Sequence, residues 1–214
     1  MTTTRIFLVR HGETLANREF RYIGARNDAL STHGEEQAKL LGEALSTFSI
    51  AAVYSSPLQR AYHTALPIAA GHGLVVQTNE DLSEGKFGIW EGLSRAEVLA
   101  RSPLDEQQLQ AWEADPTMAP PGGESFAALQ TRVCSLVEPL TAAHPGQSIV
   151  LVSHVGPIKT LLCAALGAPL TTIFNIFLDP ATISVIDWRQ PHPIVRLMNS
   201  HAHLGWELPR WQNF

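Results

Sequence analysis

The chain has 214 residues, of which 45% are hydrophobic and 16% are charged, and its net charge at pH 7 is −5. This composition fits one globular domain of moderate size and excludes a disordered chain. Mild acidity without a run of lysine and arginine argues against nucleic acid or an anionic membrane as the main partner. A few converging arginines could still form a local pocket for an anionic metabolite.

The first half of the chain alternates short apolar runs with segments typical of helices. Thr32, with Glu35 three residues later, has the form of a capping box and predicts the start of a helix. Ser56 and Pro57 predict a second helix, with the serine as its N-cap and the proline at its first position. Strands are predicted over the apolar runs at residues 5–9, 50–54 and 74–77.

The second half continues the alternation of strands and helices. Ser94 and Glu97 form another capping-box pattern. Helices are predicted over residues 94–101, 104–115, 125–144 and 157–166, and strands over 148–153, 182–188 and 194–198. This alternation predicts one α/β domain over residues 1–214, with a mostly parallel central sheet and helices on both faces.

Two histidines follow two predicted strands directly. His11 comes after the first strand and His154 after the strand at 148–153. Ligands of such sheets bind beyond the carboxyl ends of the strands, so we expect the two side chains to meet at one edge.

The cysteines and the chain start bear on the cellular compartment. Cys134 and Cys163 are far apart and lie in apolar stretches, which indicates reduced thiols. Residues 1–9 lack the apolar core of a signal peptide, and no apolar run is long enough to span a bilayer. We therefore expect a cytoplasmic protein without a membrane partner. Its oligomeric state cannot be read from the sequence.

Six short motifs follow one another between Leu8 and Lys159. They are Leu8-Val-Arg-His-Gly-Glu-Thr14, Asp28-Ala-Leu-Ser-Thr-His-Gly34, Ser55-Ser-Pro-Leu-Gln-Arg-Ala61, Leu82-Ser-Glu84 with Phe87-Gly88-x-Trp90-Glu91-Gly92, Gly122-Gly-Glu-Ser125 and Val152-Ser-His-Val-Gly156. In this order they resemble the histidine phosphatase superfamily, which includes cofactor-dependent phosphoglycerate mutases and many small-molecule phosphatases. The resemblance implies the phosphoglycerate mutase-like α/β fold and an enzyme that needs neither a metal nor a cofactor. The tail at 199–204 resembles that of α-ribazole phosphatase-like members.

The resemblance also implies the chemistry of the site. His11 would be the nucleophile that forms a phosphohistidine. Arg10 and Arg60 would hold phosphate oxygens with permanently charged planar forks, and His154 would donate to the same oxygens. Glu84 would protonate the leaving oxygen and then activate the water that hydrolyses the intermediate.

Three further residues complete the expected phosphate-binding set: Asn17, Gly24 and Val155. A role for Asn17 as a helix cap stays open. The family commonly has glycine where this chain has Val155, and a valine there would be strained if the position needs a positive φ. Other carboxylates compete with Glu84 for the acid/base role, namely Glu80, Asp81 and Glu91.

These features predict a phosphomonoesterase that acts on a small phosphorylated metabolite. The alternatives are a phosphoglycerate mutase and a non-catalytic phosphate-binding module. Only 29 residues, 93–121, separate the motifs that end at Gly92 and begin at Gly122, and predicted helices take up most of them. Little remains for a covering lid, which favours hydrolysis. Substrate selectivity is expected from residues 18–27 and 93–121, and His201 with His203 is read as structural rather than as a metal site.

Overall fold

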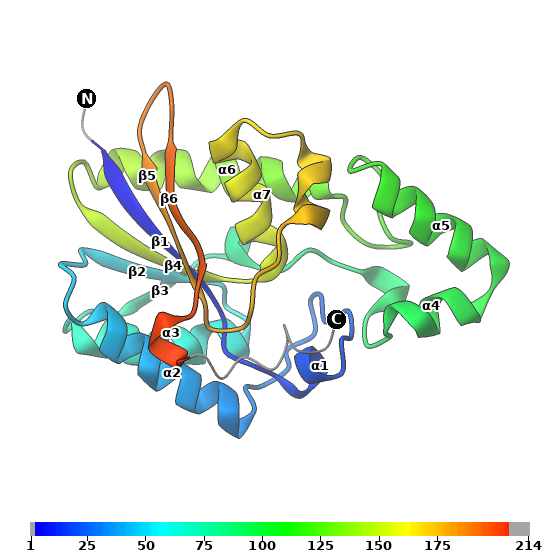
Figure 1. The fold of residues 1–214 in the computed structure, drawn as a ribbon, viewed down its shortest axis with the longest axis horizontal. Coiled ribbons are helices and arrows are strands. Elements are labelled where there is room, and N and C mark those ends of the chain that lie inside the picture. Colours follow the sequence, from blue (N-terminus) through cyan, green and yellow to red (C-terminus); the bar gives the residue numbers. More distant parts are fainter. Residues whose placement is uncertain (1–2, 206–214) are drawn as a thin grey trace.

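The computed structural model describes residues 3–205, so both ends of the predicted domain lie outside the described residues. A six-stranded sheet with the order β3-β2-β4-β1-β5-β6 forms its centre (Figure 1). Strands β1 to β4 run parallel, whereas β5 and β6 are antiparallel to their neighbours. The strands are β1 (Thr4–Arg10), β2 (Ala52–Ser55), β3 (Val76–Thr78), β4 (Ser148–Ser153), β5 (Ile183–Trp188) and β6 (Ile194–Ser200). The predicted fold class is confirmed.

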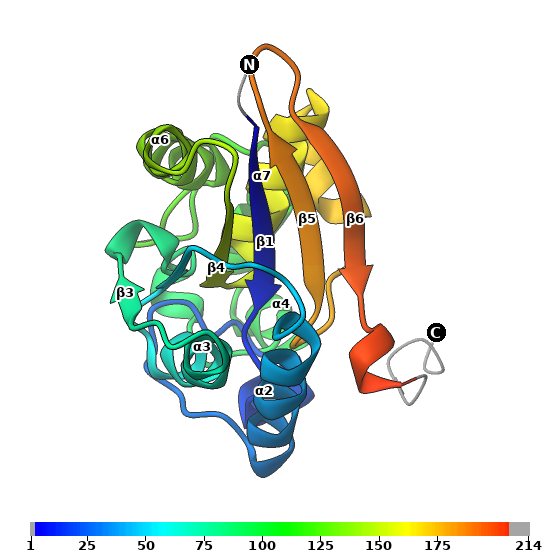
Figure 2. The same ribbon diagram turned by 90° about the vertical axis from the view of Figure 1, so that its left-hand side faces the viewer.

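Helices cover both faces of the sheet. Helices α2 and α3 pack on one face and α6 and α7 on the other (Figure 2), while α4 and α5 stand at one end of the molecule (Figure 1). The α-helices are α1 (Leu15–Arg18), α2 (Thr32–Leu45), α3 (Gln59–Gly71), α4 (Arg95–Arg101), α5 (Pro103–Ala114), α6 (Phe126–Ala143) and α7 (Val155–Leu166). Short 3₁₀ turns are η1 (Glu80–Leu82), η2 (Gly88–Trp90), η3 (Leu170–Asn175) and η4 (Ala202–Leu204).

The middle of strand β1, residues 6–9, is apolar at every position. Ile6 and Leu8 belong to the core cluster beneath α6 and α7, and Phe7 and Val9 belong to the cluster beneath α2 and α3. Successive side chains of a strand point to opposite faces, so a strand covered on both faces must be apolar at every position. A third, smaller cluster of aromatic and aliphatic side chains holds α4 and α5 in place.

The register of the central strands positions the two histidines. Arg10 at the end of β1 pairs with Ser153 at the end of β4. The next residues, His11 and His154, therefore leave neighbouring parallel strands at the same edge of the sheet. Their ring centroids are 5.0 Å apart, so the predicted convergence is confirmed.

Helix α2 begins at Thr32, as predicted, but the predicted caps of α2 and α3 are wrong. The N-cap of α2 is Ser31, whose hydroxyl accepts from the Gly34 N–H, so Thr32 and Glu35 do not form the predicted capping box. Helix α3 begins at Gln59 rather than after a Ser56 cap. The Gln59 N–H donates to the Asn27 side chain at 2.8 Å, a distant cap that a local pattern does not reveal.

Other sequence predictions agree closely with the structure. Strand β4 has its predicted bounds, and the capping box of Ser94 and Glu97 is formed at α4. Cys163 is buried and Cys134 partly buried, and both are free thiols. Within residues 3–205, each helix falls short of the length or apolarity that a bilayer-spanning segment requires.

Candidate active site

His11 is buried at the end of β1 and is held as one tautomer. Its Nδ1 lies 2.7 Å from the Gly12 carbonyl oxygen, and its Nε2 lies 3.3 Å from Nε of Arg60. A carbonyl only accepts and a guanidinium only donates, so Nδ1 carries the proton and Nε2 the lone pair. Burial, followed by the positive charges of Arg60 and Arg10, lowers the pKa of His11 well below its usual value of 6.5. The imidazole is therefore neutral, as a nucleophile must be.

His154 has the opposite tautomer. Its Nδ1 accepts from the same Nε–H of Arg60 at 3.2 Å, so Nε2 carries the proton. Within the described part of the chain, this buried Nε2 has no hydrogen-bond partner. Burial and the charge of Arg60 lower the pKa of His154 as well. A buried N–H donor without an acceptor is costly unless a ligand supplies the acceptor.

Arg60 is fully buried and orders the site around it. Its two Nη atoms donate to the Arg26 carbonyl at 2.6 Å and to the Gly24 carbonyl at 2.9 Å. Gly24 has a φ of +58°, and a Cβ there would lie 2.2 Å from the Glu91 carboxylate, so only glycine fits. Gly24, one of the residues expected to bind phosphate, holds the guanidinium of Arg60 through its carbonyl.

A cavity of about 240 Å³ opens above these residues. Six of the eight predicted site residues line it: Arg10, His11, Asn17, Arg60, Glu84 and Val155. His154 is not among the residues that line this cavity; it contacts Arg60 through its Nδ1, and its ring lies beside that of His11. Arg10 is buried, and its Nη1 donates to the Leu178 carbonyl in the segment between η3 and β5.

Glu84 reaches the cavity from the loop after η1 and is buried. Its Oε1 accepts from the backbone N–H groups of Gly85 at 2.9 Å and Gly156 at 3.1 Å. Burial raises the pKa of Glu84, while those two amides and the charges of Arg60 and Arg10 oppose the rise. A Cβ on Gly156 would lie 2.3 Å from the carboxylate, so glycine is required there. The sequence prediction did not single out Gly156.

Arg132 of α6 holds the loop that carries Glu84, and sequence reasoning missed it. Its guanidinium donates to the carbonyls of Asp81 at 2.6 Å and Ser83 at 2.8 Å. It also forms a two-bond ion pair with Glu124, at 2.8 and 2.9 Å. Glu124 belongs to the motif at 122–125, so this motif acts by fixing Arg132.

The structure shows whether Asn17 caps a helix and whether the backbone of Val155 is strained. Asn17 forms a capping box with Thr14 at α1, and the same residue lines the cavity, so the cap and the cavity wall coincide. Val155 is the first residue of α7 and is not among the non-glycine residues with positive φ in the described chain. The valine is therefore unstrained.

The outer wall of the cavity is aromatic. The ring centroids of Trp112 and Phe126 are 4.7 Å apart, and those of Phe126 and Phe174 are 5.6 Å apart. Tyr22 and Phe87 line the same cavity, with ring centroids 4.9 Å apart. Such residues look like ordinary core in a sequence, because nothing local shows that one face borders a cavity. Segments 18–27 and 93–121, from which substrate selectivity is expected, both reach the cavity, through Tyr22 and Trp112.

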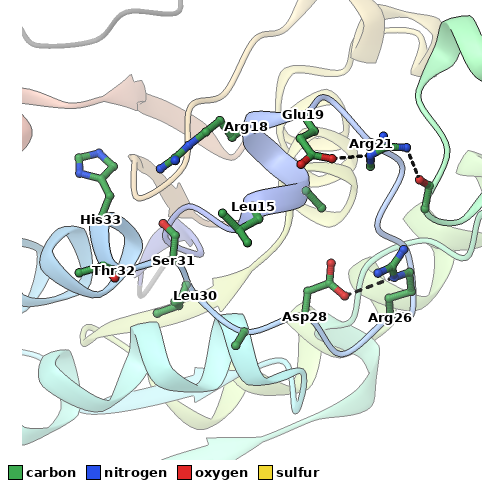
Figure 3. Close-up of a pocket in the computed structure, with 13 residues that line it drawn as sticks. Leu15, Arg18, Glu19, Arg21, Arg26, Asp28, Leu30, Ser31, Thr32 and His33 are labelled. Carbon is green, nitrogen blue, oxygen red and sulfur yellow. Dashed lines mark hydrogen bonds and ion pairs between the residues drawn. The ribbon is translucent and has the colours of Figure 1, made fainter.

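A wider groove of about 910 Å³ adjoins the cavity and shares Arg21 with it (Figure 3). Each arginine that lines the groove has a carboxylate partner. Arg18 pairs with Glu13 at 2.7 Å. The other two pairs are Arg21 with Glu19 at 2.6 Å and Arg26 with Asp28 at 3.3 Å (Figure 3). Arg21 also binds Glu97 at 2.7 Å.

The C-terminal histidines have structural partners. His203 Nε2 lies 2.9 Å from the Ala181 carbonyl oxygen, and His201 Nδ1 lies 3.3 Å from that of Asn199. Between residues 3 and 205, no three or more side chains of the metal-binding types gather in a group that could hold an ion.

Fold and site together define a class: α/β proteins with paired histidines and arginines at the carboxyl edge of a parallel sheet. The chain belongs to the histidine phosphatase superfamily, because the family described as "Histidine phosphatase superfamily (branch 1)" matches residues 6–201. The expectation of a phosphatase is confirmed at the level of the class, since the relatives and structural neighbours named below are phosphatases of this superfamily.

Two relatives match nearly the whole chain. Phosphoserine phosphatase 1 of Hydrogenobacter thermophilus is 36% identical over 202 residues, with 94% of each chain covered. The adenosylcobalamin/alpha-ribazole phosphatase of Escherichia coli is 34% identical over 199 residues, with 92% of this chain and 97% of that one covered. Longer relatives from Mycobacterium also match, and the chain spans 56% of their length.

Among solved structures, the mycobacterial glucosyl-3-phosphoglycerate phosphatase in complex with VO3 superimposes with a TM-score of 0.83 at 31% identity, covering 92% of this chain and 99% of that one. The tail at residues 199–204 resembles α-ribazole phosphatase-like members, and one of the two relatives above is such a phosphatase. The other relative matches the chain at a similar identity, so the comparisons do not decide between the two substrates.

Proposed function

We propose that this protein hydrolyses small phosphate monoesters through a phosphohistidine on His11, with Glu84 as the general acid and base. The observation that carries the proposal is the neutral His11 ring, whose unprotonated Nε2 lies in a cavity with Arg10 and Arg60. The two positively charged arginines stabilise the negative charge that spreads over the phosphoryl oxygens in the transition state. The Nε2–H of His154 adds a neutral hydrogen-bond donor.

The reaction proceeds in two halves. In the first, Nε2 of His11 attacks phosphorus, the bond to the leaving oxygen breaks, and Glu84 gives that oxygen its proton. In the second, the Glu84 carboxylate takes a proton from water, the oxygen of that water attacks the phosphorus of phospho-His11, and inorganic phosphate leaves. Both residues return to their starting states. The raised pKa of Glu84 favours the acid form that the first half requires.

The proposed site supplies positive charge and N–H donors from protein groups, with no role for a metal ion or an organic cofactor. We expect activity to survive exhaustive chelation. Loss of activity on chelation, restored by one divalent ion, contradicts this part of the proposal.

The relatives support a small phosphorylated metabolite as substrate, since their names specify phosphoserine, α-ribazole and glucosyl-3-phosphoglycerate phosphatases. The VO3 complex of one structural neighbour supports the expectation that vanadate inhibits this protein by imitating five-coordinate phosphorus.

The decisive experiment is rapid acid quenching during turnover of a ³²P-labelled monoester. The label should appear on His11 as an acid-labile, alkali-stable phosphoryl group, and His11→Ala should carry none. Label on serine, aspartate or cysteine would overturn the mechanism. Circular dichroism of His11→Ala checks that the fold is intact.

The same purified protein also distinguishes a phosphatase from a phosphoglycerate mutase. Residues 93–121 are largely occupied by α4 and α5, which wall one side of the cavity through Trp112. We expect release of inorganic phosphate to exceed isomerisation of 3-phosphoglycerate, with 2,3-bisphosphoglycerate present as primer. Primed isomerisation that is far faster than phosphate release would replace the phosphatase by a mutase.

A further inference from the structure

Lys159 is a cation of the cavity that the proposed phosphatase mechanism does not use. It stands on α7, one helical turn after Val155, in a helix whose other residues are mostly apolar and buried. Helical side chains lean toward the N-terminus of their helix, and here that end carries His154 and Val155. Lys159 lines the same cavity as Arg10 and Glu84.

The other cations of the cavity are engaged by protein groups. Arg60 donates to two histidines and two carbonyls, and Arg21 forms ion pairs with Glu19 and Glu97. Arg10 donates to the Leu178 carbonyl. Within residues 3–205, the ammonium of Lys159 forms neither a hydrogen bond nor an ion pair, whereas each arginine of the groove pairs with a carboxylate.

The surroundings of Lys159 are apolar and strengthen its attraction for an anion. Helix α7 packs against α6 and η3, which bring Phe126, Ile173 and Phe174 to the cavity wall. Burial, followed by the charge of Arg10, lowers the pKa of Lys159 to about 8, whereas Glu84 and Cys163 oppose this shift. The ammonium is therefore mostly protonated at neutral pH, and a bound anion would hold it so.

The size and charge of the cavity specify the anion. The proposed mechanism assigns Arg10 and Arg60 to the phosphate, which leaves one compact ammonium for the rest of the substrate. Lysine binds as a single point charge, and a cavity of about 240 Å³ holds little beyond a phosphate and a short organic group. A carboxylate, with one negative charge and a small volume, satisfies both conditions.

We propose that Lys159 binds a carboxylate on the alcohol part of the substrate, so that the protein selects small phosphate monoesters that carry an acid group. This inference rests on the proposed function of the same cavity. It assigns Lys159 a role in specificity, distinct from the transfer of phosphate by His11 and Glu84.

The test compares phosphate esters that differ only in the carboxylate, as inhibitors of p-nitrophenyl phosphate hydrolysis. O-phosphoserine and O-phosphoethanolamine form such a pair, and 3-phosphoglycerate with glycerol 3-phosphate repeats it without an amino group. The wild-type protein should bind the acid-bearing member about 10- to 100-fold more tightly, the range of a charge-assisted contact. Competition measures binding even when neither ester is turned over quickly.

Lys159→Met should bring this ratio close to one, and Lys159→Arg should keep most of it. Lys39→Met, the same change at an exposed residue of α2, should keep the wild-type ratio. A wild-type ratio near one overturns the proposal. So does a Lys159→Met protein that loses affinity equally for both members, because Lys159 would then act on the phosphate or on Glu84. In either case continued p-nitrophenyl phosphate hydrolysis leaves the phosphatase proposal standing.

The pH dependence of the ratio gives a second readout. Lys159 is charged below its pKa, so the preference for the acid-bearing ester should be full at neutral pH and decline above about pH 8. Arg10 stays charged in this range, and any titration of Glu84 or Cys163 affects both esters alike. In Lys159→Met the ratio should not vary with pH. A wild-type ratio that does not vary between neutral pH and well above 8 excludes Lys159 as the carboxylate ligand.

Discussion

The proposed catalytic cavity and the neighbouring groove share Arg21 but differ in how their charges are balanced. The groove is almost four times larger, at about 910 Å³ against about 240 Å³, and each of its three arginines pairs with a carboxylate. In the cavity, Arg60 is fully buried and its donors meet only neutral histidine nitrogens and carbonyls.

We infer from this difference that unbalanced buried charge, rather than volume, distinguishes the proposed active site from the groove. An exposed ion pair contributes little stability and leaves little field to attract a ligand. A buried guanidinium without a directly bound carboxylate is costly to maintain, and a folded protein retains it where an anion is to be bound. The same argument separates Lys159 from the groove arginines.

The largest effect is expected from Arg60→Met. Removal of a charge that faces the transferring phosphoryl group should lower kcat/KM by about 10³- to 10⁵-fold. It should also raise the pKa of both His11 and His154, because the charge of Arg60 lowers both. Steady-state kinetics and histidine titration by NMR measure the two effects. If the histidine pKa values stay where they are, the electrostatic account of the site is wrong.

Glu84→Gln should lower kcat by about 10²- to 10⁴-fold with alkyl phosphates, whose leaving oxygens need a proton. The loss with p-nitrophenyl phosphate should be far smaller, because its phenolate leaves unaided. If kcat falls equally with both substrates, Glu84 is not the leaving-group acid, and one of the nearby carboxylates takes that role.

The pH profile of kcat/KM tests the same pair of groups. His11 must be neutral, and its lowered pKa places the acid limb below pH 6.5. Glu84 must be protonated, and its raised pKa places the alkaline limb above pH 4.5. Activity should therefore fall as pH rises through the Glu84 pKa, and Glu84→Gln should lose this limb. An alkaline limb that persists in Glu84→Gln would belong to another group.

Arg132→Met should have a smaller effect, since Arg132 positions the Glu84 loop without lining the cavity. Displacement of Glu84 should lower kcat by about 10- to 100-fold with alkyl phosphates and leave KM nearly constant. Arg132→Lys should restore little, because one ammonium cannot reach two carbonyls and Glu124 together. A loss that affects p-nitrophenyl phosphate as strongly would indicate general damage to the fold.

The smallest effect is expected in the groove. Arg18→Met makes the same chemical change at an exposed residue whose ion pair with Glu13 is 2.7 Å long. It should cost at most about 1 kcal/mol in the free energy of unfolding and change kcat/KM by less than about twofold. Denaturant unfolding and steady-state kinetics measure both. A large kinetic loss would make the groove part of the substrate site.

The sequence by itself determined the α/β fold and the convergence of His11 and His154. Both depend on short-range patterns, namely apolar runs of strand length and the residue that follows each strand. The six motifs added Arg10, Arg60 and Glu84, which the structure brings to one site. Asn17 and Val155 were also placed at the cavity.

Tertiary structure alone decided the features that depend on contacts between distant segments. The Asn27 cap of α3, the hold of Arg132 on the Glu84 loop and the approach of Gly156 to the carboxylate each join residues at least 30 positions apart. Lys159 left a faint local signal as a lysine in an otherwise apolar helix. A role in ligand binding could be inferred only from the structure, which places Lys159 in one cavity with Arg10 of β1 and the aromatic wall. The reason is that the charge of a side chain acts on the groups that the fold places beside it.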